Sequence, residues 1–312
     1  MTTGLHLAKL LSAGQDNLIT AAQCRELGLS PARVGRLLAA RTWRTVFRGV
    51  YRTEAGPPDE RQRIRAGLLG GGRAAVAVLS SAARLHGWPV LPDDSTVQIS
   101  LPAGLRRLDQ PDLTTRQLVL APADVTRVDG MAVTTPARTA ADLVLRLSRP
   151  LAVPMLDAAL RADLLTEQDL GTVQTLIYGN RGATRARESL LATDARAQSP
   201  LESRIRLICV DGGVGPEDLQ FPVYDDFGTL IALADLAWPS RGVLAEADGR
   251  APHSTPEAVL HDRRRQNALL TRGFVVLRFT WSDVRRSAYV VQTVRQALCR
   301  AADRPQPPAR SA

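Results

Sequence analysis

The chain has 312 residues and a formal net charge of +9; 45% of its residues are hydrophobic and 23% are charged. This composition is typical of a soluble globular protein of two or three domains. No apolar run approaches the about 20 residues of a membrane-spanning helix, and the first residues lack the features of a secretory signal. Three scattered cysteines indicate neither a disulfide framework nor a zinc site. We therefore expect a cytoplasmic protein with no membrane partner.

Arginine supplies nearly all of the positive charge, because Lys9 is the only lysine. The excess is uneven along the chain. Residues 1–58 carry +5 (eight basic and three acidic residues), residues 59–198 carry +2 (17 and 15), and residues 199–300 carry +1 (13 and 12). A basic surface attracts phosphate, although a solvated basic face would give the same count. The concentration at the N-terminus favours a nucleic-acid partner.

Residues 18–53 predict two short helices followed by a β-hairpin. Thr20 and Ser30 are suitable N-caps for the two helices. The stretch TWRTVFRGVYR then mixes apolar with basic residues and is expected to turn at Gly49. This pattern predicts a winged helix-turn-helix domain over residues 1–58.

In such a domain the second helix enters the major groove of DNA and the wing contacts the backbone. We therefore predict that Arg33 and Arg36 of the second helix contact bases or phosphates. In the hairpin, Arg44 and Arg48 are predicted to contact phosphates. Double-stranded DNA is the predicted partner. The alternative is a small helical domain with a solvated basic face or with a protein partner.

Residues 59–198 alternate helical and strand patterns and predict an α/β middle region. One helix is expected to be capped by Ser80 or Ser81. Arg138 and Asp142 are four residues apart on another predicted helix and are expected to form an ion pair. Residues 179–199 are expected to be a connector, and we assign no chemistry to this region.

Three phrases in the first two regions carry a family resemblance: RGVYR after the helix pair, SSAARLHG and TTPARTAADL. The chain resembles AbiEi-type antitoxins, the antitoxin half of type IV toxin–antitoxin pairs. The resemblance implies an N-terminal winged helix, an AbiEi-like middle region and a cognate toxin as a further partner.

Residues 199–300 predict a third domain, which begins with a helix capped by Ser199. The expected order is helix, three strands, helix, strand and helix. The elements after the first helix are expected at Phe221–Tyr224, Leu230–Ala237, Val243–Ala247, Pro256–Arg272, the strand GFVVLRFTW and Asp283–Arg300. Residues 301–312 are expected to form a disordered tail. The expected fold class is thus α+β multidomain.

The order of elements resembles the PD-(D/E)XK restriction-endonuclease-like core, and more closely the Vsr-like endonuclease domains. The residues that carry this resemblance are Glu202, Asp235, Glu246, Asp248, His253, Asp262, Arg265 and Arg278. The resemblance implies an α/β nuclease core and an acidic site for phosphodiester hydrolysis.

Three carboxylates of this set are predicted metal ligands: Asp235, Glu246 and Asp248. Glu246 and Asp248 share one face of a strand because alternate residues do so, and Asp235 comes from the preceding strand. Converging carboxylates repel unless a cation neutralises them, and oxygen ligands suit Mg²⁺ or Mn²⁺. Such an ion would activate water for hydrolysis. Glu202 is expected to hold an outer-shell water or a second cation.

The lysine that usually follows the second acid is missing, because Asp248 occupies that position. His253 is then the candidate general base, since histidine titrates near neutral pH. Arg263 and Arg265 are predicted to face DNA phosphates. The alternative is that the acids form ion pairs with nearby arginines: Arg204, Arg206, Arg263 and Arg278.

The main expectation is a DNA-binding protein with a Vsr-like nuclease domain that hydrolyses DNA with a divalent metal ion. The alternative is a non-catalytic AbiEi-like antitoxin or transcriptional regulator of a toxin–antitoxin or phage-defence locus. A third expectation is a protein-interaction module that has kept a degenerate nuclease core. The missing lysine leaves catalytic competence open.

Overall fold

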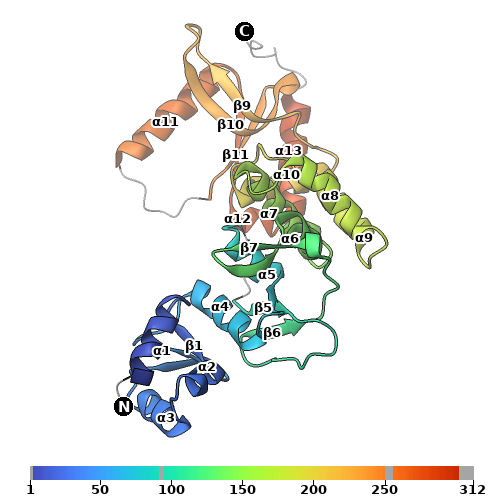
Figure 1. Cartoon of the computed structure of the whole chain (residues 1–312). Helices are drawn as coiled ribbons and strands as arrows, with labels where there is room; N and C mark the ends of the chain where they lie inside the picture. The colour runs from blue at the N-terminus through green and yellow to red at the C-terminus, as the bar shows by residue number, and fades with distance from the viewer. Residues whose placement is uncertain (1–2, 91–94, 250–255, 302–312) are drawn as a thin grey trace. The chain divides into compact units, whose positions relative to one another are not determined.

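The computed structural model is a mixed α/β protein with three β-sheets in its described part (Figure 1). The expected α+β multidomain class is confirmed at this level. No helix there is long and apolar enough to cross a membrane. The described residues are 3–90, 95–249 and 256–301. The tail expected at residues 301–312 therefore lies, beyond its first residue, outside them.

The chain divides into two compact units, each with its own core. The first unit comprises Met1–Arg146 and Glu167–Ala183. The second comprises Leu147–Thr166 and Thr184–Ala312. Each unit is described separately below.

The first unit begins with three helices and a three-stranded antiparallel sheet of order β1-β3-β2. The predicted caps are present: Thr20 Oγ1 accepts a hydrogen bond from Gln23 N at 3.1 Å, and Ser30 Oγ accepts one from Arg33 N at 3.3 Å. The hairpin turns at Gly49, whose φ of 77° favours glycine. These elements are α1 (Thr3–Ala13), β1 (Leu18–Thr20), α2 (Ala21–Glu26), α3 (Pro31–Ala39), β2 (Arg44–Phe47) and β3 (Val50–Arg52).

Helix α1 and strand β1 complete a small core that holds α3 in place. Ala8 of α1, Ile19 of β1 and Cys24 of α2 are buried together with Val34 of α3 and Trp43. Val34 is the buried anchor of α3, so the opposite face of this helix is left exposed.

The rest of the first unit is built on a five-stranded mixed sheet of order β6-β5-β4-β8-β7. Strand β4 pairs parallel to β8, β5 pairs parallel to β6, and the other two pairings are antiparallel. The elements are α4 (Glu60–Gly71), β4 (Val76–Ala77), α5 (Leu79–Leu85), β5 (Val97–Ser100), β6 (Leu113–Arg116), β7 (Val125–Val128), β8 (Met131–Thr134), α6 (Pro136–Val144) and α8 (Glu167–Ile177).

The predicted serine cap of α5 is wrong. Val78 is the N-cap residue and makes no side-chain cap bond. Ser80 and Ser81 lie inside the helix and are buried. Their hydroxyl groups accept hydrogen bonds from Gln98 of β5, at 3.1 Å from Nε2 and 2.8 Å from the backbone N. The serines thus satisfy buried donors of the sheet, which are costly to leave unpaired.

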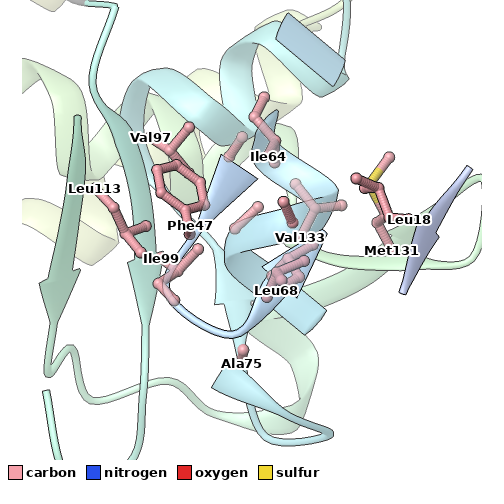
Figure 2. Packing of buried hydrophobic residues seen from close by; sticks show 14 of the residues in the cluster. Leu18, Phe47, Ile64, Leu68, Ala75, Val97, Ile99, Leu113, Met131 and Val133 are labelled. Atoms are coloured by element: carbon pink, nitrogen blue, oxygen red, sulfur yellow. The ribbon is translucent and has the colours of Figure 1, made fainter. Parts of the chain in front are cut away.

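One hydrophobic core joins the small N-terminal sheet to the larger sheet of the same unit (Figure 2). Phe47 and Val50 of the hairpin belong to the same buried cluster as Ile64 of α4. Val97 and Ile99 of β5 complete it from the larger sheet. The hairpin is therefore packed on the region behind it.

The second unit contains a four-stranded sheet of order β12-β11-β10-β9. Strands β9, β10 and β11 are antiparallel neighbours, and β12 lies parallel to β11 after the crossover helix α11. From α10 onward, the predicted order of helix, three strands, helix, strand and helix is confirmed, with the short helix α12 before the last helix. The elements of the second unit are α7 (Arg149–Arg161), α9 (Ala183–Leu191), α10 (Pro200–Asp211), β9 (Asp218–Tyr224), β10 (Leu230–Trp238), β11 (Val243–Ala247), α11 (Pro256–Thr271), β12 (Val275–Phe279), α12 (Trp281–Val284) and α13 (Ser287–Ala301).

Helix α9 occupies the stretch that was expected to be a connector, so that prediction is wrong. Ala186 is fully buried along this helix. Ser189 is also buried, and its hydroxyl donates to the carbonyl of Arg185 at 3.0 Å within the helix. These two small residues let α9 pack closely.

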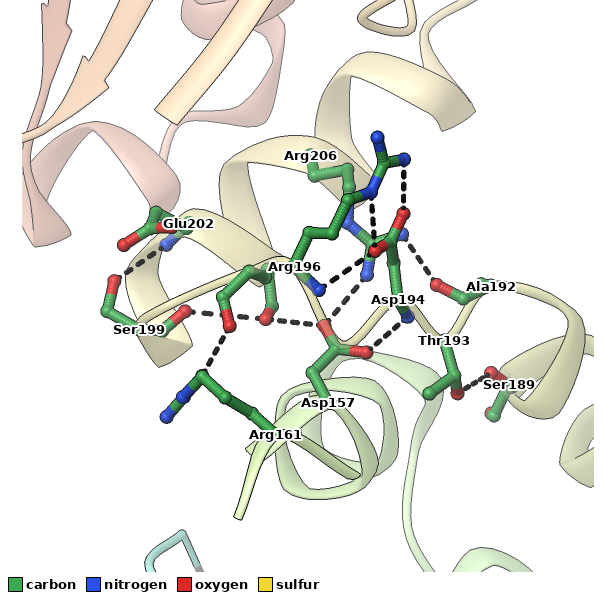
Figure 3. A network of polar contacts seen from close by, with 12 residues as sticks. Asp157, Arg161, Ser189, Ala192, Thr193, Asp194, Arg196, Ser199, Glu202 and Arg206 are labelled. Atoms are coloured by element: carbon green, nitrogen blue, oxygen red, sulfur yellow. Dashed lines mark hydrogen bonds and ion pairs between the residues drawn. The ribbon is translucent and has the colours of Figure 1, made fainter. Parts of the chain in front are cut away.

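A buried carboxylate, Asp157 of α7, ties three segments of the second unit together (Figure 3). Only 1% of Asp157 is exposed. It accepts hydrogen bonds from the Ser203 hydroxyl at 2.6 Å, from Arg206 Nη2 at 2.7 Å and from the Asp194 backbone N at 2.7 Å. Burial raises the pKa of Asp157, and the Arg206 charge opposes that rise. Arg206 was predicted as one alternative ion-pair partner of the site acids. It pairs instead with Asp157 of α7.

Candidate functional site

The first candidate site is the carboxylate–arginine cluster of the second unit: Glu202, Asp235, Glu246, Asp262, Arg265 and Arg278. Glu202 lies in the first turn of α10, where Ser199 Oγ accepts a hydrogen bond from its backbone N at 3.2 Å. Asp235 comes from β10 and Glu246 from β11. Glu202 and Glu246 are only 6% and 8% exposed, so these acids are held inside the fold.

Gln220 of β9 joins two of the predicted acids. Its Nε2 atom donates to Glu202 Oε2 at 2.8 Å and also approaches Asp235 Oδ1 at 3.4 Å. Asp235 Oδ2 accepts a hydrogen bond from the Ala247 backbone N at 2.7 Å. Burial raises the pKa of Asp235 to about 6, and the negative charge of Glu202 adds to the rise. The Gln220 amide thus links Glu202 and Asp235.

The sequence prediction missed Gln220. The one signal in the sequence is a polar residue inside the apolar strand LQFPVY. Gln220 adopts a φ of 50°, in the left-handed region that only a few non-glycine residues occupy. Such backbone strain is common where a side chain must be aimed at a site. No sequence pattern indicated this conformation.

Glu246 is engaged by two arginines. Its Oε1 lies 2.9 Å from Arg265 Nη1, and its Oε2 lies 3.2 Å from Arg278 Nε. Asp262 of α11 binds the same two arginines, at 3.0 Å to Arg265 Nη2 and 2.8 Å to Arg278 Nη1. Burial raises the pKa of Glu246, and both guanidinium groups oppose the rise. Arg265, which was predicted to face DNA phosphates, thus forms ion pairs with Glu246 and Asp262.

Of the two remaining residues of the predicted acidic site, Asp248 and His253, the structure describes only Asp248. Asp248 is exposed after the end of β11, and its backbone N donates to the Phe279 carbonyl at 2.8 Å. His253 lies outside the described residues. Arg263 is exposed on α11.

A divalent ion would have to compete for the oxygens of this cluster. Both oxygens of Glu246 face arginines, and one oxygen of Asp235 already accepts from the backbone. In the described ranges, no three His, Cys, Asp or Glu side chains form a group that could hold a metal ion. The Mg²⁺ or Mn²⁺ site at Asp235, Glu246 and Asp248 stays a prediction, because an ion-free arrangement does not test it.

The second candidate site is the basic N-terminal surface: Arg33 and Arg36 of α3, Arg44 of β2 and Arg48 in the hairpin turn. All four side chains are exposed. Within the described residues none of them forms an ion pair. The backbone N of Arg48 donates to Gln110 Oε1 at 2.8 Å, which fixes the turn to the region behind it. The surface thus presents four exposed guanidinium groups from α3 and the β2–β3 hairpin.

The middle of the first unit holds a further ion-pair network. Arg138 Nε lies 3.0 Å from Asp142 Oδ2, as predicted, and Arg138 Nη1 lies 2.8 Å from Asp124 Oδ2. Burial raises the pKa of Asp142, and the Arg138 hydrogen bond and charge oppose it. His86 Nε2 lies 2.7 Å from the Thr134 carbonyl. The Arg138 contacts tie α6 to the segment at Asp124 and confirm the predicted ion pair with Asp142.

Residues 75–192 match the AbiEi antitoxin C-terminal domain. The chain is also 35% identical over 242 residues to the "Uncharacterized protein Rv2248" of Mycobacterium tuberculosis strain H37Rv, covering 77% of this chain and 86% of that protein. The "Uncharacterized protein MT2308" of strain CDC 1551 gives the same figures. The chain therefore belongs to the family of these two proteins, and its middle region is an AbiEi antitoxin C-terminal domain.

A solved structure, that of the RV2827C protein from Mycobacterium tuberculosis, aligns with a TM-score of 0.41 and 16% identity over 74% of this chain and 91% of its own. The family match supports the expected antitoxin or regulator more than the expected nuclease. It covers neither residues 1–58 nor residues 199–300.

Proposed function

We propose that the protein is a DNA-binding regulator of the antitoxin type. In this proposal, α2 and α3 form a helix-turn-helix, and the β2–β3 hairpin forms its wing. The observation that carries it is the basic N-terminal surface, where exposed arginines lack carboxylate partners in the described part of the chain. The AbiEi antitoxin domain directly behind this surface supports a regulatory role.

The geometry of the basic N-terminal surface suits a DNA duplex. Arg33 and Arg36 are three residues apart on α3, so both project from one side of the helix opposite Val34. A helix presented in this way can enter a major groove, where arginine binds guanine edges or phosphates. Arg44 and Arg48 extend the positive charge onto the hairpin, where phosphate contacts fix the register of a protein on DNA.

The test is fluorescence anisotropy with duplex DNA from the region upstream of the protein's own gene. Wild-type protein should bind with an affinity that falls steeply as salt rises. The double variant Arg33→Gln with Arg36→Gln should bind weakly and show a smaller salt slope. The matched control is Arg106→Gln with Arg187→Gln, which removes two exposed arginines elsewhere. Equal affinity of the two variants would contradict the proposal.

A cognate toxin is proposed as the protein partner, on the strength of the AbiEi domain alone. Co-expression with the product of an adjacent gene should relieve growth arrest caused by that product. The DNA-binding double variant should still relieve it if the antitoxin region acts separately from residues 1–58. An adjacent product that is harmless by itself would remove this part of the proposal.

A metal-dependent nuclease is the second candidate function. It is favoured by the convergence of Glu202, Asp235 and Glu246, whose charges act on one another. In this function Asp248, His253 and Arg263 keep the roles predicted above. Mn²⁺ should then bind to the wild type in calorimetry and fail to bind to Asp235→Ala. Absence of Mn²⁺ binding with and without DNA would leave the regulator as the function.

A further inference from the structure

The first unit contains a cavity of about 680 Å³ that the proposed DNA contacts do not use. Its walls come from α2 and the residues before it, from α4, and from the β7–β8 hairpin. Small-molecule sites in proteins have volumes of about 300–1,000 Å³, so the size suits one compact ligand.

The charge of the lining favours an anion. Three lining residues are arginines, Arg65, Arg73 and Arg127, and one lining residue, Glu26, is acidic. Arg65 is held by Asp16, with Nε 2.5 Å from Oδ2. Arg73 and Arg127 are exposed and, among the described residues, form no ion pair.

Arg73 and Arg127 keep most of their hydrogen-bond donors for a ligand. Arg127 uses Nη1 to donate to the Gly130 carbonyl at 2.8 Å. A guanidinium group carries five N–H donors in a planar fork that matches the oxygens of a phosphate. Two such groups at one cavity make a phosphate the preferred anion, because charge-assisted pairs of this kind are strong and directional.

The rest of the lining indicates what the phosphate is attached to. Leu68, Ala75 and Met131 are buried side chains that contribute apolar wall. The amides of Gln15 and Gln23 are bonded to each other, with Gln23 Nε2 donating to Gln15 Oε1 at 3.0 Å, and form a fixed polar wall. The cavity therefore combines a cationic rim with a mixed apolar and amide interior.

We infer that this cavity binds a phosphorylated small molecule with a compact apolar portion, the class to which mononucleotides belong. Arg73 and Arg127 hold the phosphate, and the wall at Leu68 and Met131 receives the remainder. This inference goes beyond the proposed regulatory function and does not rest on it.

The test is calorimetry of AMP, GMP, CMP and UMP with the full chain at low salt and without DNA. At least one mononucleotide should bind saturably, and its uncharged nucleoside should bind at least about tenfold more weakly because the phosphate contacts are lost. Arg73→Gln with Arg127→Gln should weaken binding by a similar factor. Both side chains are exposed, so this variant is expected to fold, which a thermal melt verifies.

Two matched variants separate this proposal from the DNA-binding one. Arg106→Gln with Arg187→Gln removes the same charge away from the cavity and should keep wild-type mononucleotide affinity. Arg33→Gln with Arg36→Gln should also keep it while losing DNA affinity. The inference is overturned if no mononucleotide binds, if the nucleoside binds equally well, or if the Arg106 and Arg187 control loses as much. It is also overturned if the cavity variant loses DNA affinity alone, since Arg73 and Arg127 would then serve the DNA backbone.

Discussion

Two groups of arginines, one in each unit, differ in how they are paired. On the basic N-terminal surface, Arg33 and Arg36 are exposed and form no ion pair in the described ranges. In the second unit, Arg206 is held by buried Asp157, and Arg265 and Arg278 are held by Glu246 and Asp262. The same residue type is thus exposed and without an ion pair in the described part of the N-terminal surface, and it neutralises buried acids in the second unit. The proposal of DNA binding at the N-terminal surface therefore rests on the pairing of its arginines rather than on their number.

The largest expected effect tests the buried ion pair between Asp157 and Arg206. Asp157→Ala should lower the free energy of unfolding by about 3–5 kcal/mol, because it leaves the buried Arg206 charge without its partner. Urea denaturation monitored by circular dichroism measures the change. DNA affinity of the folded variant should equal that of the wild type. A loss of stability below about 1 kcal/mol would contradict the assigned role of the pair.

The next effect tests the exposed arginines of α3, Arg33 and Arg36. Arg33→Gln with Arg36→Gln should weaken DNA binding by about 10- to 1,000-fold, since each contact to a base or phosphate contributes a substantial share of affinity. Its melting temperature should stay near that of the wild type, because both side chains are exposed. Differential scanning fluorimetry beside the anisotropy titration provides both values. Unfolding of this variant would show that Arg33 and Arg36 are needed for the fold, as the paired arginines of the second unit are expected to be.

Glu246→Ala should lower the free energy of unfolding by about 1–3 kcal/mol, because it removes a buried side chain that contacts both Arg265 and Arg278. Asp262 still binds both arginines in this variant. Arg264→Gln, on the exposed side of α11, is the control and should change stability by less than about 0.5 kcal/mol. Equal stability of the two variants in urea would show that the cluster is not needed for folding.

The smallest expected effect is a pH dependence. Because the folded pKa of Asp235 is raised to about 6, the folded chain holds this proton more tightly than the unfolded chain does. Stability from Asp235 is therefore fully present below the unfolded pKa of about 4 and is lost as pH rises through 6. Asp235→Asn lacks this loss and should gain on the order of 1–2 kcal/mol relative to wild type between pH 4 and 7, after allowance for solvent screening. Urea series at four pH values measure it, and a constant difference would argue against the raised pKa.

Local signals in the sequence predicted much of the fold. Thr20 and Ser30 cap α2 and α3 through contacts within four residues, and the Gly49 turn depends on one backbone angle. The alternating patterns of the second unit likewise predicted its strands. Helix α1 was missed. Ser80 and Ser81 were assigned to a cap because their true partner, Gln98, comes from a distant strand.

The sequence indicated several acids of the candidate cluster but not their partners. The resemblance to Vsr-like domains implied that Glu202, Asp235 and Glu246 lie in one region. In the structure, Gln220 contacts two of them, Glu202 and Asp235. The ion pairs of Glu246 depend on α11 and β12, which the sequence could order along the chain but not orient. The exposed state of Arg33 followed from helical periodicity around Val34.

The core that Phe47 and Val50 share with Ile64 has a consequence for cooperativity. A segment that loses apolar partners when it is cut from its neighbour does not fold as an autonomous unit. Cleavage after residue 58 would strip the hairpin of its contacts with α4 and β5. Backbone amides of the β2–β3 hairpin and of β5 should therefore exchange with deuterium in the same opening event. The β2–β3 hairpin and the AbiEi domain behind it would then fold and unfold together.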